Sequence, residues 1–186
     1  EGLNGRVDIL LADYRDFDDD IDYDAICSIG MSEHVGVRNL PGYFSALRAR
    51  LRPGGRLLNH CISRSDSLVS PHAGAFIDRY VFPDGELPPL GTIVTAAHDV
   101  GLEVRHVESL REHYAMTLAA WGANLQEHWD DALQEVNLGT AKVWGLYMAG
   151  SRLAFEQNEI GVNQVLAVNV GPDGDARMPL RPTWGS

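Results

Sequence analysis

The stretch ICSIGMSEHVG, residues 26–36, decides the fold that we expect for this chain. Its first half is an apolar run typical of a buried parallel strand, which we predict over residues 22–31. An acid and an imidazole, Glu33 and His34, follow the end of that strand. In α/β sheets, ligands bind outside the carboxyl ends of the strands. The stretch therefore predicts both a buried strand and the rim of a site.

Strand and helix patterns alternate along the rest of the chain. Apolar alternation and short apolar runs predict strands over residues 6–13, 22–31, 55–63, 102–110 and 161–170. Apolar residues at helical spacing predict helices over residues 40–52, 92–101, 114–136 and 139–157. Proline and glycine mark residues 64–90 and the tail over 171–186 as irregular. This order predicts an α/β fold: a parallel sheet with right-handed crossovers and helices on both faces.

The composition is that of one globular domain. The chain has 186 residues, of which 45% are hydrophobic and 22% are charged, and this length can bury one sizeable core. The formal net charge of −11 argues against a general affinity for nucleic acid or anionic membranes, because those surfaces recruit Lys and Arg. We expect one domain over residues 1–170, followed by the tail, and no nucleic-acid partner.

The two cysteines, Cys27 and Cys61, lie inside apolar runs. Their spacing fits neither a disulfide framework nor a metal site, so both are predicted to be buried free thiols in a reducing compartment. No apolar run approaches the roughly 18 residues of a membrane span, and no signal-peptide pattern is present. We therefore expect a soluble cytoplasmic protein. The chain begins abruptly and without Met, which suggests a fragment whose N-terminal portion is missing.

An acidic run, DYRDFDDDIDYD, occupies residues 13–24. It does not fit a calcium loop, because Tyr23 or Ala25 stands where that loop needs glycine. A solvated acidic loop is expected over residues 18–24. Asp13 differs, because it ends a predicted strand just before Tyr14. A carboxylate and a ring in that position suit the exocyclic amine and the flat face of a base.

Glu33, His60 and Tyr114 lie at strand ends and a helix start, where they could form a pocket that handles protons. Each also has a purely structural explanation. Glu33 could cap the following helix, His60 could be a satisfied core residue, and Tyr114 could pack into the core. No nucleophile pattern of serine or cysteine with histidine is present, and there is no glycine-rich dinucleotide motif or P-loop.

Six motifs, taken in order, resemble the cyclopropane-fatty-acyl-phospholipid synthase family, relatives of the mycolic acid cyclopropane synthases: LADYRD, SIGMSEHVG, YFSALRARLRPGGRLLNHCIS, FIDRYVFPDGELP, EHYAMTLAAWGANL and GVNQVLAV. FIDRYVFPDGELP and EHVG are the most specific of them. The resemblance implies the C-terminal part of a class I S-adenosylmethionine-dependent methyltransferase, with a Rossmann-like sheet that is N-terminally truncated. It implies methyl transfer to the cis double bond of a phospholipid acyl chain, and closure of a cyclopropane ring when the resulting carbocation loses a proton.

The resemblance also implies which residues form the site. A bound bicarbonate ion would accept the proton, held by the side chains of Glu33, His60 and Tyr114 and by the backbone of Ile29 and Ile62. An anion at that place would stabilise the cation without admitting bulk water.

Two further groups of residues have expected roles. Asp13 and Tyr14 resemble the positions that contact the adenine of S-adenosylmethionine. A cysteine that contacts bicarbonate in the family lies outside this chain, so neither Cys27 nor Cys61 is given its role. Four aromatic residues suit a substrate tunnel and equally suit core packing: Phe76, Tyr80, Phe82 and Trp121.

The chain departs from the family pattern beside the expected pocket. Ser32 stands where Phe is common, and Asn59-His60-Cys61 stands where Leu-His-Thr is frequent, so the substrate or the outcome could differ. The family's glycine-rich loop and ribose-binding acid are absent, so this chain alone is expected to bind the cofactor poorly.

Alternatives that remain open are a related methyltransferase without ring closure and an inactive binding module. The expected partners are phospholipid acyl chains, met by peripheral contact at the inner face of the membrane. A homodimer is also compatible with the sequence.

Overall fold

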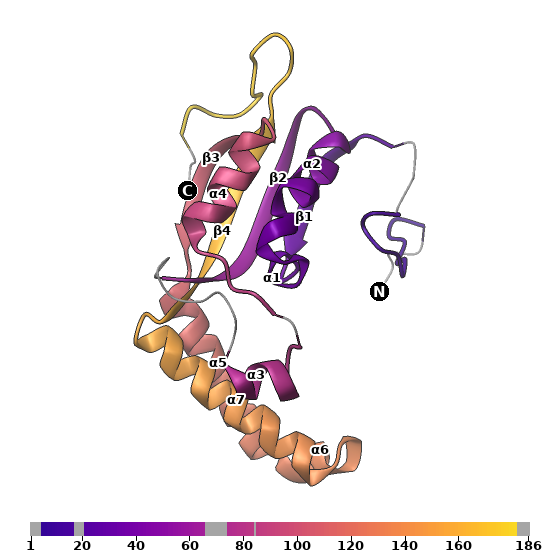
Figure 1. Ribbon diagram of the computed structural model, residues 1–186. Coiled ribbons are helices and arrows are strands. Elements are labelled where there is room, and N and C mark those ends of the chain that lie inside the picture. The colour runs from indigo at the N-terminus through magenta and orange to yellow at the C-terminus, as the bar shows by residue number, and fades with distance from the viewer. Residues whose placement is uncertain (1–4, 17–20, 66–73, 84, 182–186) are drawn as a thin grey trace.

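The computed structural model describes residues 5–16, 21–65, 74–83 and 85–181, and within them it shows an α/β fold (Figure 1). The sheet has the order β1-β2-β4-β3. Its strands are β1 (Tyr23–Ile29), β2 (Leu51–Arg64), β3 (Glu103–Ser109) and β4 (Ile160–Asn169). The helices are α1 (Ser32–Val35), α2 (Leu40–Ala49), α3 (Ala75–Tyr80), α4 (Leu90–Asp99), α5 (Arg111–Glu127), α6 (Trp129–Glu135) and α7 (Leu138–Glu156), with a 3₁₀ turn at Val37–Asn39.

The direction of β4 differs from the prediction of a parallel sheet. β1 and β2 are parallel, whereas β4 is antiparallel to both β2 and β3. The cause is the helical connection: α5 leaves the sheet at the end of β3, and α7 brings the chain back to that same end (Figure 1). A strand that starts there has to run backwards. The carboxyl ends of β1, β2 and β3 therefore share one edge with the amino end of β4.

One face of the sheet is covered by α2 and α4. The helical spacing of Tyr43, Phe44 and Leu47 places all three in a buried cluster with Leu57 of β2 and Ala97 of α4. Because side chains alternate along a strand, Leu57 and Cys61 both reach this face of β2, while the residues between them reach the other. This is the larger of the two apolar cores and fixes the sheet against its helices.

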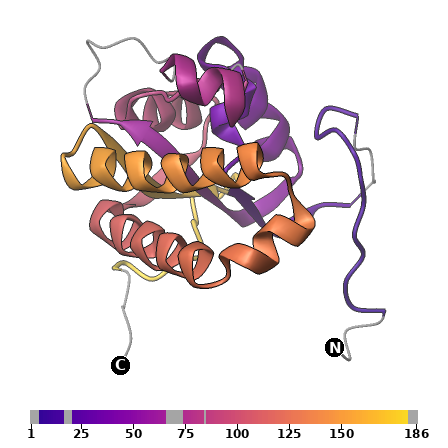
Figure 2. The ribbon, with the colours of Figure 1, turned by 90° about the horizontal axis from the view of Figure 1, so that it is seen from below.

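The other face is covered near the carboxyl edge by α5 and α7, which lie side by side (Figure 2). Their buried side chains form a second core with Val162 of β4, and Ile62 of β2 packs against it. The predicted helical pattern over 114–136 is interrupted at His128, where α5 ends and α6 begins. Helices thus cover both faces of the sheet at the edge where the site was expected.

The segment 5–16 is not the strand that was predicted over 6–13. It has no strand assignment, and Ile9 and Leu11 are fully exposed or nearly so, at 94% and 107% of the reference area. Figures 1 and 2 show it beside the sheet and not within it. An apolar alternation becomes a strand only when a neighbour takes its backbone hydrogen bonds, and none of the described strands pairs with it. Residues 17–20, most of the expected acidic loop, lie outside the described residues.

The strand β1 is less buried than expected. It lies at one edge of the described sheet, Cys27 is exposed and Ile29 is 68% exposed. The register places Cys27 opposite Leu58, on the face that α5 and α7 cover only near the carboxyl edge. The prediction of a buried thiol is therefore correct for Cys61 and wrong for Cys27.

Two regions predicted as irregular carry order of their own. Residues 64–90 contain the short helix α3. The described part of the tail, residues 171–181, has no helix or strand, but it folds back on the sheet: Arg56 Nη2 donates to the carbonyl oxygen of Arg177 at 3.1 Å, and Ala176 is buried. None of the helices in the described part is long and apolar enough to cross a bilayer.

Candidate active site

The candidate site starts at Gly30, directly after β1. The Gly30 N–H donates to the carbonyl oxygen of His60 at 2.9 Å, so the pairing with β2 extends to this residue. The φ of Gly30 is +62°, a left-handed conformation that favours glycine. The chain turns out of the sheet here and enters α1, which brings Glu33 back over the end of β2.

Glu33 is a buried carboxylate bound to the neighbouring strand. Only 6% of it is exposed, its Oε1 accepts from the Ile62 N–H at 2.7 Å, and its Oε2 accepts from Ser32 Oγ at 3.4 Å. The carbonyl oxygen of Glu33 accepts from the Glu86 N–H at 3.0 Å, which ties α1 to the loop after α3. Burial of a carboxylate is costly unless it accepts such bonds. The side chain joins α1 to β2, and it does not act as the helix cap that was the alternative.

His60 lies on β2, on the face toward α5. Its ring centroid is 6.5 Å from that of Tyr114, and its Nδ1 lies 3.4 Å from Nε2 of Gln164, its partner in the β2–β4 register. The residue is partly exposed, unlike its neighbours Asn59 and Cys61. His60 is therefore not a fully enclosed core histidine.

Tyr114 lies in the first turn of α5. Its ring packs against Phe155 of α7 at a centroid distance of 5.1 Å and against Trp121 at 6.1 Å. Burial raises the pKa of the Tyr114 phenol, and the negative charge of Glu33 raises it further. The phenol therefore stays protonated at neutral pH and can act as a hydrogen-bond donor.

One cavity of about 640 Å³, hereafter the strand-end cavity, joins these groups. Its lining contains every residue expected to bind bicarbonate, namely Ile29, Glu33, His60, Ile62 and Tyr114. Much of the remaining wall is apolar and comes from α3, α7 and the loop between α3 and α4. The arrangement combines proton-transferring groups with a surface suited to a hydrocarbon.

The four residues of the expected tunnel divide into two pairs. Phe76 and Phe82 line the strand-end cavity. Tyr80 and Trp121 do not line it and are 57% and 47% exposed. Tyr80 packs beside Phe76, and Trp121 packs beside Tyr114, so both lie one ring away from the cavity wall.

A second cavity, hereafter the Tyr14 cavity, has about 780 Å³ and lies between the segment 5–16 and α1 and α2. Both expected adenine contacts, Asp13 and Tyr14, line it, and the Tyr14 ring packs edge-on to Tyr43 at 5.3 Å. Both carboxylate oxygens of Asp13 accept from the Arg15 side chain, at 2.9 and 2.6 Å. These hydrogen bonds lower the pKa of Asp13 to about 2.

His34, which is not among the expected site residues, lines both cavities. Its ring packs edge-on to Phe82 at 5.5 Å. Tyr147 and Ser151 also line the strand-end cavity, and Gln164 contacts His60 from outside it; none of these three was singled out from the sequence. Gln164 could have been noticed in the sequence, because it is a polar residue in the apolar run GVNQVLAV. A groove of about 840 Å³ beside α4 contains none of the predicted site residues.

The model of the mycolic acid cyclopropane synthetase family matches residues 1–165. The chain belongs to this family. A probable fatty acid methyltransferase of Mycobacterium tuberculosis is 56% identical over 184 residues, which are 99% of this chain and 43% of that protein. A probable fatty acid methyltransferase of Pseudomonas putida is 44% identical over 182 residues, 96% of this chain and 46% of that protein.

A solved structure, the mycolic acid cyclopropane synthase CmaA1 complexed with SAH and CTAB, superposes with a TM-score of 0.76 at 30% identity. The superposed region covers 85% of this chain and 59% of the CmaA1 chain. The chain spans about half the length of the curated relatives it matches. The family and the class I methyltransferase fold predicted from the sequence are thus confirmed, and the family comprises S-adenosylmethionine-dependent lipid methyltransferases and cyclopropane synthases.

Proposed function

We propose that the protein containing this chain transfers the methyl group of S-adenosylmethionine to the cis double bond of an unsaturated phospholipid acyl chain and closes a cyclopropane ring. The observation that carries this proposal is the meeting of Glu33, His60 and Tyr114 in one largely apolar cavity. An acyl chain can lie against Phe76, Phe82 and their apolar neighbours while its double bond reaches the polar groups.

The reaction has to dispose of one proton. The methyl carbon forms a bond to one alkene carbon as its bond to sulfur breaks, and the other alkene carbon becomes cationic. A proton then leaves the transferred carbon, and the electron pair of that C–H bond closes the ring. The role that we assign to Glu33, His60 and Tyr114 is to hold the proton acceptor beside this cation.

Bicarbonate would supply the proton-accepting oxygen in this scheme. Its fit rests on the donors that reach the cavity: the protonated Tyr114 phenol and the His60 ring, whose centroids are 6.5 Å apart. The Ile62 N–H, which the family resemblance assigns to the anion, donates here to Glu33 Oε1. Glu33 Oε1 is therefore the acceptor at this amide, and the Ile62 N–H would be shared between Glu33 and the anion.

S-adenosylmethionine would supply the electrophilic methyl group. The Tyr14 cavity fits its adenine by the chemistry of its wall, since Tyr14 offers a ring face or edge and Asp13 offers an acceptor. Asp13 is engaged by Arg15, but both side chains of this pair are well exposed, and an exposed ion pair rearranges at little cost. His34, which lines both cavities, marks where the cofactor and the acyl chain would approach each other.

Methyl transfer without ring closure is the second candidate. Both relatives described above are named as probable fatty acid methyltransferases. Ser32, Asn59 and Cys61, the positions at which the chain departs from the family pattern, are all buried next to Glu33 or His60. Different residues around the proton acceptor can change which proton the cation loses, and thereby change the product.

Acyl chains of phospholipids lie in a bilayer, so the proposal includes peripheral contact with a membrane during turnover.

Isotope labelling separates ring closure from methyl transfer without ring closure. The full-length protein is expressed in a host that makes no cyclopropane lipids and is supplied with methyl-trideuterated methionine. Ring closure removes one deuteron, so a cyclopropane product retains two and resists ozonolysis. A methyl branch whose cation loses a proton from the acyl chain retains all three, and ozonolysis cleaves the double bond that remains. If neither product appears and calorimetry detects no S-adenosylmethionine binding, the lipid methyltransferase proposal fails and a binding module is favoured.

A further inference from the structure

We propose that Gln164 is a positioning residue that fixes the tautomer of His60, so that the ring keeps its proton on Nε2 and presents an N–H to the strand-end cavity. The inference deepens the proposed function and rests on it for the role of His60. It arises from the pairing of β4 with β2, which joins two residues that are 104 positions apart in the sequence.

The geometry places the two side chains on the same face of the sheet. His60 and Gln164 are direct partners in the antiparallel register of β2 and β4, so their side chains stand next to each other. Gln164 Nε2 lies 3.4 Å from His60 Nδ1. Within the described residues, Gln164 is the side chain that bonds to this ring. The backbone of His60 is fixed as well, because its carbonyl oxygen accepts from Gly30.

The chemistry of the two groups then determines the proton's place. An amide nitrogen carries only donors, so Nδ1 of His60 has to accept. A neutral imidazole has one protonated and one bare nitrogen, and the proton therefore lies on Nε2. That nitrogen is on the far side of the ring from Gln164.

An N–H in this position suits the site in a way that a bare nitrogen does not. The cavity already contains the Glu33 carboxylate and would hold an anion, and both are acceptors. A fixed N–H beside them stabilises negative charge without reorganising during the reaction. Gln164 does not line the cavity, so it acts through His60 and not on the substrate.

The test is the nitrogen chemical shifts of His60 in the full-length protein labelled with ¹⁵N-histidine, because a protonated and a bare ring nitrogen have well-separated shifts. The expected result for the wild type is a protonated Nε2 and a bare Nδ1. A bare Nε2 in the wild type overturns the inference. In Gln164→Leu, which removes the donor and suits a strand, we expect the two tautomers to mix. Gln164→Met is the second variant if Leu disturbs folding.

The matched substitution is Gln164→Glu, which presents an acceptor to Nδ1 and should move the proton there. Its control is Gln134→Glu on α6, which makes the same charge change at an exposed position and should leave His60 unchanged. Glu108 stands opposite Gln164 on β3, so Gln164→Glu places two negative charges side by side, which destabilises a sheet. The unfolding midpoint is therefore measured for Gln164→Glu and for its control.

Product formation separates this inference from the function on which it rests. We expect kcat of Gln164→Leu to fall about tenfold with an unchanged KM for S-adenosylmethionine, about the loss that one misplaced hydrogen bond causes. If the His60 shifts change and kcat does not, the inference about Gln164 holds and the assigned role of His60 fails. If neither changes, the positioning role is overturned.

Discussion

The strand-end cavity and the Tyr14 cavity are similar in size but are built in different ways. Glu33 and His60 line the first, and they are held by hydrogen bonds to Ile62 and Gln164 on two neighbouring strands. The second is closed on one side by the segment 5–16, which pairs with none of the described strands (Figure 1). Its charged pair, Asp13 and Arg15, is bonded within that segment.

The difference shows which parts of a site a sheet can organise in advance. Groups on paired strands, or hydrogen-bonded to them, are placed by the strand register. Groups on a segment without a paired neighbour depend on what else packs against them.

The largest effect is expected at Glu33. In Glu33→Gln the amide oxygen can still accept from the Ile62 N–H, so the fold should persist, but the side chain loses its charge and its capacity to hold the proton acceptor. We expect turnover of the full-length protein to fall by roughly 10²–10⁴, the range for a group that takes part in proton transfer. The control is Glu112→Gln on α5, whose side chain is 80% exposed. Unchanged turnover in Glu33→Gln would remove this residue from the site.

The buried thiol should react far more slowly than the exposed one. Burial raises the pKa of Cys61 to about 12, so this side chain holds very little thiolate at neutral pH. Cys27 lies on the exposed face of β1. Native labelling with iodoacetamide, followed by peptide mass spectrometry, should modify Cys27 first, and denaturant should make the rates equal. Equal native rates would show that the core around β2 opens readily.

Stability should respond to the core and hardly at all to the segment 5–16. Phe44 is completely buried between α2 and the sheet, and Phe44→Ala is expected to lower the free energy of unfolding by about 3–5 kcal/mol. Ile9 is 94% exposed, and Ile9→Ala should stay within about 0.5 kcal/mol. Urea unfolding measures both. A loss of several kcal/mol at Ile9 would mean that the segment packs against something in solution.

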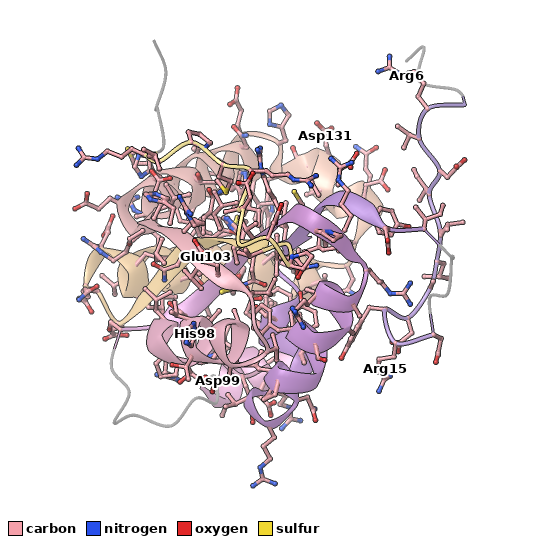
Figure 3. All side chains as sticks on the ribbon, turned by 90° about the horizontal axis from the view of Figure 1, so that it is seen from above. Arg6, Arg15, His98, Asp99, Glu103 and Asp131 are labelled. Atoms are coloured by element: carbon pink, nitrogen blue, oxygen red, sulfur yellow. The ribbon has the colours of Figure 1, made fainter. Side chains whose placement is uncertain are left out.

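The smallest effect concerns Asp13. Its pKa of about 2 is caused by the hydrogen bonds from Arg15, so Arg15→Ala should raise it toward the ordinary value of about 3.9. Because the folded-state pKa is lowered, any stabilisation by this pair is present above the ordinary pKa and is lost as the pH falls toward 2. Carboxyl ¹³C titration measures the shift. Arg6, labelled at the other end of the segment in Figure 3, provides the control Arg6→Ala.

Periodicity predicted most of the elements but not how they are arranged. The apolar run at 22–31 and the helical spacing of Tyr43, Phe44 and Leu47 report local preferences, and β1 and α2 follow them. The direction of β4 depends on where a distant helical pair returns the chain, which no local pattern records. Residues 6–13 have the pattern of a strand, but the pairing partner that would make them one is not among the described strands.

For the candidate site, as for the fold, the sequence indicated the parts but not all of their contacts. Glu33, His60 and Tyr114 could be singled out by their places at strand ends and a helix start, and all three gained their roles through the family resemblance. The structure brings all three together. Gln164 and His34 could not be assigned, because cross-strand register and the meeting of two cavities are properties of the assembled sheet.

The helical pair α5 and α7 has a consequence for how this protein family can diversify. The pair is a single excursion from the carboxyl edge of the sheet, leaving after β3 and returning at β4 (Figures 1 and 2). It supplies Tyr147 and Phe155 to the cavity wall, while Glu33 and His60 come from the sheet side. Lengthening or re-facing these helices changes the room for a hydrocarbon and leaves the strand register intact. Tyr114, in the first turn of α5, is the one proton-handling residue that this excursion carries. Selection for a new lipid can therefore act on α7 without disturbing Glu33, His60 or Tyr114.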